Sequence, residues 1–188
     1  MTARTIVAVG AASVVLGVAT TGLIALASGG PPPASASCEA PALAGAVVNV
    51  SLTDMGDMMG PGMMGPSGHM RGMGMMRITA DPATVSAGQI SLRANNFGAL
   101  THEVVILPLA PGQWPGQRAI GADGEVDESG SVGEASRTCG ADEGEGILPG
   151  ASGWTTLTLP PGRYELLCNI AGHYGAGMYT ELDVTGNR

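Results

Sequence analysis

The chain has 188 residues, a formal net charge of −8 at pH 7 and a sequence pI near 4.6. This acidic balance leaves no basic face, so we exclude a nucleic-acid-binding function. Aromatic residues make up only 3% of the chain and 31 residues are glycine, which predicts an aliphatic core and abundant loops. The length suits one domain with appendages.

The N-terminal segment predicts export. Residues 1–28 carry one charged side chain, Arg4, ahead of an apolar run long enough to span a bilayer, which takes about 20 residues. The small residues of 25–27 and 34–36 each offer a cleavage pattern. We therefore predict an extracytoplasmic protein; cleavage of the signal and its retention as an N-terminal membrane anchor both stay open. Residues 29–45 are rich in Pro, Gly, Ser and Ala, which is typical of a linker.

Residues 46–188 are predicted to form one all-β domain. Short alternating runs are separated by Gly, Pro, Asn and Asp, the pattern of a β-sandwich, and no convincing helix follows the N-terminal segment. The expected strands are 46–52, 77–80, 84–86, 89–95, 102–107, 152–159, 163–168 and 178–184.

A methionine-rich segment, residues 55–76, follows the first expected strand. It holds nine of the eleven methionines, together with His69, and its many Gly and Pro residues predict a loop. Three interpretations stay open. Thioethers favour Cu(I), so the segment could capture that ion; it could be an adaptable apolar surface for a partner; or it could be a low-complexity insertion without a ligand.

The stretch 111–150 is long for a connection within a compact domain, and such loops are usually functional or disordered. Eight carboxylates lie between Gly121 and Gly146, with Arg137 as the single basic residue. They predict either a solvated loop that keeps the protein soluble or a negative patch that steers a basic partner. We do not expect a catalytic pair among them, because no apolar pocket is nearby to raise a pKa.

The C-terminal region carries the chemistry. Cys168, His173 and Met178 recur every five residues in one Gly-rich loop between two expected strands. Thiolate and thioether are soft ligands and imidazole is intermediate, which suits copper better than calcium or magnesium. A blue-copper site uses one more histidine. His102 is in phase with the apolar residues of its strand, whereas His69 lies in the methionine-rich loop and is the poorer candidate.

The pattern Cys-x4-His-x4-Met, with an upstream His opening a Val-rich strand and the run Pro-Pro-Gly-Arg-Tyr before the Cys strand, resembles the cupredoxins. The loop length is similar to that of the sulfocyanin and rusticyanin group. The resemblance covers roughly residues 77–185, and more loosely reaches back to 46. It implies a Greek-key β-sandwich, one copper ion and one-electron transfer. It also implies the copper ligands His102, Cys168 and His173 in a plane, with Met178 axial.

The sequence departs from the cupredoxin pattern at Glu103, where many members have an Asn that helps to tie the two ligand loops together. This puts the hydrogen bonding around the Cys168 sulfur, and so the reduction potential, in doubt.

Four protein ligands leave no open position for a substrate, so we expect an electron carrier and not an enzyme. The expected partner is a redox protein, basic or membrane-bound, and the sequence indicates no oligomeric state. Electrons are expected to pass through His173, within an apolar contact of Ile170, Ala171, Tyr174, Ala176 and methionine-rich residues. Two alternatives stay open: extracytoplasmic copper sequestration or delivery through the methionine-rich loop, with additional Cu(I) bound there, and a metal-free surface β-sandwich.

Two cysteines remain if Cys168 holds metal. Cys38 and Cys139 can form a disulfide, which persists in an oxidising compartment. Lipidation of Cys38 after signal cleavage, or two free thiols, are the alternatives.

Overall fold

In a computed structural model, the described residues are 38, 40–54 and 76–186. The chain divides into two units, Met1–Ala34 and Ser35–Arg188, and all the described residues belong to the second. The expected N-terminal helix, most of the methionine-rich segment and His69 lie outside the described residues.

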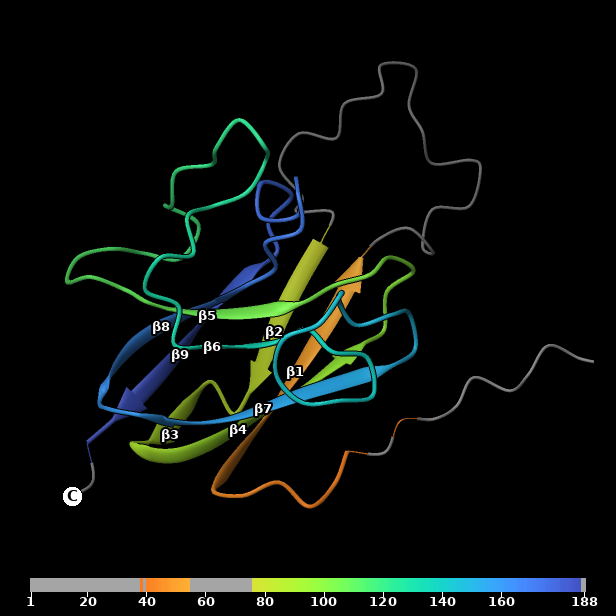
Figure 1. The fold of residues 1–188 in the computed structure, drawn as a ribbon. Coiled ribbons are helices and arrows are strands. Elements are labelled where there is room, and N and C mark those ends of the chain that lie inside the picture. The colour runs from red at the N-terminus through yellow and green to blue at the C-terminus, as the bar shows by residue number, and fades with distance from the viewer. Residues whose placement is uncertain (1–37, 39, 55–75, 187–188) are drawn as a thin grey trace, which may run out of the picture. The chain divides into compact units, whose positions relative to one another are not determined.

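The described residues form an all-β sandwich of two sheets, as the sequence predicts (Figure 1). The four-stranded sheet, here called sheet A, has the order β2-β1-β4-β7. Its strands are β1 (Ala46–Asp54), β2 (Met76–Asp81), β4 (Gly88–Asn96) and β7 (Ser152–Leu159). β1 pairs antiparallel with β2 and parallel with β4, so the first strand is central to this sheet.

The five-stranded sheet, sheet B, has the order β3-β9-β8-β5-β6. Its strands are β3 (Thr84–Ser86), β5 (Val104–Pro108), β6 (Gly133–Ala135), β8 (Gly162–Leu167) and β9 (Tyr179–Thr185). Neighbouring strands are mostly distant in sequence, as Greek-key connections require. The eight expected strands are all present, with small shifts at their ends, while β6 was not predicted.

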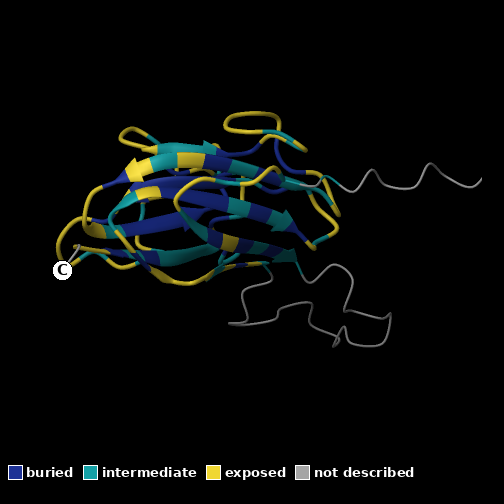
Figure 2. Ribbon diagram, turned by 90° about the horizontal axis from the view of Figure 1, so that it is seen from below, coloured by how far each residue is buried: buried dark blue, intermediate teal, exposed yellow. Residues whose placement is uncertain are grey.

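The core lies between the sheets because side chains alternate along each strand. The inward-facing set is aliphatic and fully or almost fully buried, which Figure 2 shows as dark blue stretches along the strands. It includes Val48, Val50, Leu52, Ile90, Leu92, Ala94, Val104, Ile106, Leu166, Leu182 and Val184. Cys168 and Met178 belong to the same cluster, so the ligand candidates lie on core-facing positions as the strand phase predicts.

A second apolar cluster lies on the other face of sheet B, and the long acidic connection contributes to it. Val105, Leu107 and Leu167 point to that face, where Val126 and Tyr174 pack on them. Val126 comes from the long connection, which also supplies β6 and several isolated bridges. The connection therefore covers sheet B, although many of its carboxylates remain exposed.

Of the three possibilities left open for the two remaining cysteines, the structure shows the disulfide. Cys38 and Cys139 are joined across a sequence separation of 101 residues, which ties the segment before β1 to the connection between β5 and β7. Cys168 is buried and unpaired. The described residues contain no helix, and hence none long and apolar enough to cross a membrane.

Candidate metal centre

The loop between β8 and β9 carries three of the four predicted ligands. Cys168 directly follows β8 and Met178 directly precedes β9. The loop is closed at its base by a hydrogen bond from the Cys168 N–H to the Met178 carbonyl, 3.1 Å. Inside it, the Met178 N–H donates to the His173 carbonyl at 3.2 Å, and Gly177 adopts a φ of 96°. This turn brings residues from the two ends of the loop together.

His102 comes from the segment just before β5, the strand that pairs with β8 in sheet B. It lies two residues before β5, in an isolated bridge with Ile147: the His102 N–H donates to the Ile147 carbonyl at 3.1 Å, and the reverse bond is 2.6 Å. The sequence predicted a strand from 102; the structure begins β5 at Val104 and holds His102 through this bridge instead. The side chain is fully buried, which fixes the imidazole against the loop that carries Cys168.

Three ligand atoms converge between these elements. His102 Nδ1 lies 3.2 Å from His173 Nδ1, Cys168 Sγ lies 3.3 Å from His173 Nδ1, and the remaining Sγ–Nδ1 distance is 4.0 Å. All three atoms lie within 4.8 Å of one another. The residues predicted from the sequence as the planar ligands are thus brought together.

The donor set fits a single copper ion. The point that lies in the plane of the three atoms and is equidistant from them is about 2.1 Å from each. This distance is close to the length of a zinc–imidazole bond, which is about 2.0–2.1 Å. Two imidazoles and one thiolate form the trigonal set of blue-copper sites. Met178 is fully buried at the closing end of the same loop, on the core side.

Burial dominates the protonation of the site. It raises the pKa of the Cys168 thiol to about 12, while backbone N–H groups of Glu103 and Ile170 donate to the sulfur and oppose the rise. A bound cation must therefore offset desolvation to hold a thiolate here. Burial, and then the neighbouring His102, lower the pKa of His173. A neutral imidazole is the form that binds metal.

Glu103 ties the two ligand segments together, which answers the doubt raised by the sequence. Its carboxylate accepts a hydrogen bond from the Asn169 N–H at 3.0 Å, and its own N–H donates to Cys168 Sγ. Burial, followed by repulsion from Glu134, raises the pKa of Glu103 to about 7. The carboxylate thus makes the kind of link between ligand loops that the resemblance assigns to an Asn.

The acidic connection contacts the ligand loop directly. Asn169 donates to the Glu128 carboxylate at 2.7 Å and exchanges two hydrogen bonds with the backbone of Val126. The Gly172 N–H donates to the Gly124 carbonyl at 2.9 Å. The acidic segment 123–128 therefore lies beside the loop that carries His173.

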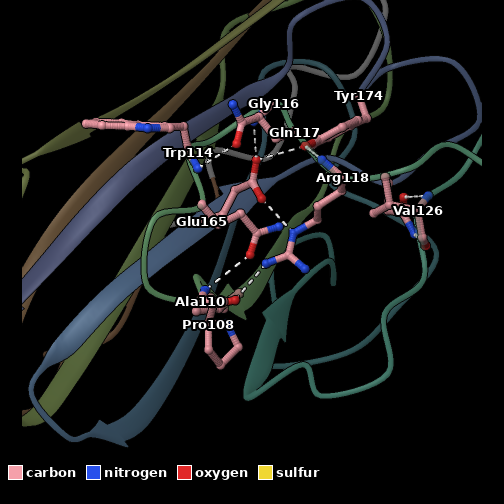
Figure 3. A network of polar contacts seen from close by, with 12 residues as sticks. Pro108, Ala110, Trp114, Gly116, Gln117, Arg118, Val126, Glu165 and Tyr174 are labelled. Carbon is pink, nitrogen blue, oxygen red and sulfur yellow. Dashed lines mark hydrogen bonds and ion pairs between the residues drawn. The ribbon is translucent and has the colours of Figure 1, made fainter.

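A buried ion pair holds the start of the same connection, and the sequence did not reveal it. Glu165, fully buried on β8, accepts from Arg118 Nε at 2.6 Å, from the Gly116 N–H at 2.7 Å and from the Tyr174 hydroxyl at 3.0 Å (Figure 3). The Arg118 guanidinium also donates to the Pro108 carbonyl, and the backbone N–H of Arg118 donates to the Tyr174 hydroxyl. Tyr174 is therefore buried, and the expectation that it forms part of an apolar docking contact is wrong.

Asp54 is a second residue that the sequence analysis missed. Its Oδ2 lies 2.9 Å from His102 Nε2, and the two side chains are 3% and 0% exposed. A signal was available: Asp54 is in phase with Val48, Val50 and Leu52, so an acidic residue continues the core-facing side of β1.

One family model matches most of the chain. The Sulfocyanin (SoxE) domain model matches residues 70–188, well over half of the chain. Among curated proteins, no sequence matches the chain significantly.

Solved structures give partial matches. Reduced auracyanin from Roseiflexus castenholzii is 26% identical over 56% of this chain and 82% of its own, with a TM-score of 0.38. Rusticyanin from Thiobacillus ferrooxidans is 21% identical over 76% of this chain and 79% of its own, with a TM-score of 0.42. Auracyanin A from Chloroflexus aurantiacus, described as a "blue" copper protein, is 17% identical over 75% and 99%, with a TM-score of 0.40. On the strength of the match over residues 70–188, the chain belongs to the sulfocyanin family of cupredoxins.

Proposed function

We propose that this protein is an exported mononuclear blue-copper protein that carries single electrons between redox partners. The observation that carries the proposal is the convergence of two imidazole nitrogens and one buried sulfur around one point. Membership of the sulfocyanin family supports the same function. Copper bound there supplies one-electron chemistry by alternating between Cu(II) and Cu(I).

The ligand roles follow from chemistry and burial. His102, Cys168 and His173 would hold the metal through two imidazoles and a thiolate, and the Met178 thioether would be the weak ligand that helps to set the potential. Backbone hydrogen bonds to the sulfur and the bridge at His102 keep these side chains in place. With four protein ligands, the site has no position for a substrate, which supports a carrier and not an enzyme.

His173 is the proposed route for electrons. His102 and Cys168 are fully buried, whereas residue 173 is of intermediate burial, so His173 is the ligand with the shortest path to a partner. Ala171 is exposed and Ile170 and Ala176 partly exposed in the same loop, which supports an apolar contact around this ligand.

We further propose that the partner is a basic redox protein. Asp123, Glu125 and Asp127 are exposed and belong to the connection that hydrogen-bonds to the ligand loop. Complementary charge beside an electron port raises association rates by about 10- to 1,000-fold at low salt.

The proposed location is outside the cytoplasm. The Cys38–Cys139 disulfide supports it, because disulfides persist in oxidising compartments. The apolar run of residues 1–28 supports export and leaves open whether the N-terminus stays in the membrane.

The test is the visible spectrum of the protein after addition of Cu(II), compared with Cys168→Ser. We expect an intense thiolate-to-copper band in the wild type and none in Cys168→Ser. His69→Ala is the matched control: it removes the third histidine of the chain and should leave the band unchanged. A folded wild-type protein without the band would refute the proposal.

Copper stoichiometry separates a carrier from a sequestration or delivery protein. A carrier binds about one copper per chain and retains it on reduction. Binding of several Cu(I) ions, lost when the methionines of residues 55–76 are replaced by leucine, would favour copper handling.

A further inference from the structure

Asp54 is a charged residue outside the ligand set that contacts a proposed ligand directly. It is the last residue of β1, and its Oδ2 lies 2.9 Å from His102 Nε2. Both side chains are almost completely removed from solvent. A buried carboxylate at this distance from an imidazole makes a strong, charge-assisted hydrogen bond.

The turn after β4 forms a cradle for this carboxylate. The Leu100 N–H donates to Asp54 Oδ2 at 3.0 Å, so the same oxygen binds both the turn and the histidine. A Cβ added at Gly98 would overlap the Asp54 carboxylate, so this position requires glycine for close approach. Asn96, 1% exposed, holds the turn by donating to the carbonyls of Leu100 and Ile147 at 2.7 Å each.

The hydrogen bond decides which nitrogen of His102 is free. An ionised carboxylate only accepts, so Nε2 carries the proton. In the neutral imidazole the lone pair then lies on Nδ1, the atom 3.2 Å from His173 Nδ1 and 4.0 Å from Cys168 Sγ. The Ile147 bridge holds the backbone of His102, and Asp54 holds its ring.

We propose that Asp54 is a positioning residue that locks His102 in the tautomer and orientation needed for metal binding. It also makes the Nδ1 nitrogen of His102 a stronger metal ligand. Its negative charge favours Cu(II) over Cu(I), so it lowers the reduction potential. The effect on metal rests on the proposed copper site, whereas the effect on the tautomer belongs to the metal-free protein and stands without copper.

The variants separate charge from orientation. Asp54→Asn keeps a hydrogen-bond acceptor and removes the charge; Asp54→Ala removes both. Gly98→Ala keeps the charge and displaces the carboxylate. Asp183→Asn is the matched control, because it removes the same charge from β9, four residues beyond Tyr179 and away from the ligand loop.

The measurements are the nitrogen-15 NMR shifts of His102 in the metal-free protein, and the Cu(II) affinity and reduction potential of the copper-loaded protein. Loss of a carboxylate partner of a ligating histidine typically costs about 10- to 100-fold in metal affinity. Each tenfold loss of Cu(II) affinity that Cu(I) does not share raises a one-electron potential by about 59 mV. In Asp54→Asn we expect the reduction potential to rise by this order and the His102 tautomer to be retained. In Asp54→Ala and Gly98→Ala we expect a mixture of His102 tautomers.

A proton on Nδ1 of neutral His102 in the wild-type protein overturns the proposal, whatever the variants do. The proposal is also overturned if the reduction potential and the Cu(II) affinity of Asp54→Asn and Gly98→Ala match those of Asp183→Asn, while circular dichroism shows that these variants are folded. A wild-type protein without the thiolate–copper band refutes the proposed function instead, and the tautomer measurement still decides the role of Asp54.

Discussion

The Arg118–Glu165 pair offers a test of how the long connection is held on sheet B. Glu165 is fully buried and its carboxylate receives three donors, of which Arg118 is the only cation. Arg118→Met keeps most of the side-chain volume and removes the charge. It leaves a buried carboxylate with two neutral donors, and breaking a buried pair in this way costs about 3–5 kcal/mol of unfolding free energy.

The assay is urea unfolding of the metal-free protein, followed by circular dichroism. The double variant Arg118→Met with Glu165→Leu should recover most of the loss, since no charge is left buried.

Arg163→Met is the matched control. Its guanidinium pairs with Glu181 through two hydrogen bonds, yet both side chains are about one-third exposed, so the cost should be much smaller. Equal costs for Arg118→Met and Arg163→Met would refute the view that Glu165 is a buried charge held by Arg118.

Three other predictions concern the acid beside the site, the disulfide and the partner. Burial raises the pKa of Glu103 to about 7, so the stability that this group contributes is fully present below pH 4.5 and is lost as the pH rises through 7. In urea unfolding of the metal-free protein, Glu103→Gln should remove this loss, which is at most about 3 kcal/mol at pH 8. Parallel pH profiles of the unfolding free energy in the wild type and the variant would contradict this prediction. The disulfide closes a loop of about 100 residues, so Cys139→Ser and Cys38→Ser should each lower the unfolding free energy by about 2–5 kcal/mol in the same assay, whereas unequal losses would point to another role for one thiol. Asp123→Asn with Glu125→Gln should slow electron exchange with a basic partner such as a cationic cytochrome in stopped-flow experiments at low salt, and not at high salt; an equal effect at both would argue against steering.

Local patterns predicted much of the fold and which side chains converge at the candidate metal centre. Alternation along β8 put Cys168 on the core-facing side, and the structure agrees. The five-residue spacing of the loop, with the resemblance that it carried, led to His102 and His173, whose ring nitrogens converge with the sulfur. These inferences succeeded because strand phase and loop length are properties of short segments.

The remaining features depend on contacts between distant segments. The burial of Glu165 and Tyr174 arises only because the connection between β5 and β7 folds back on sheet B. β6 is three residues long and pairs with β5, so it has no pattern of its own. Asp54 lies in phase with core residues, but its histidine partner is 48 residues away and is reached through the parallel pairing of β1 with β4.

The most direct test of the central claim is a redox titration of the copper-loaded protein, followed by its thiolate–copper absorption. We predict that one electron per chain abolishes the band, that one oxidising equivalent restores it, and that copper stays bound throughout. A band that does not respond to reduction, or copper that is released when it is reduced, would contradict the proposal that the protein is an electron carrier.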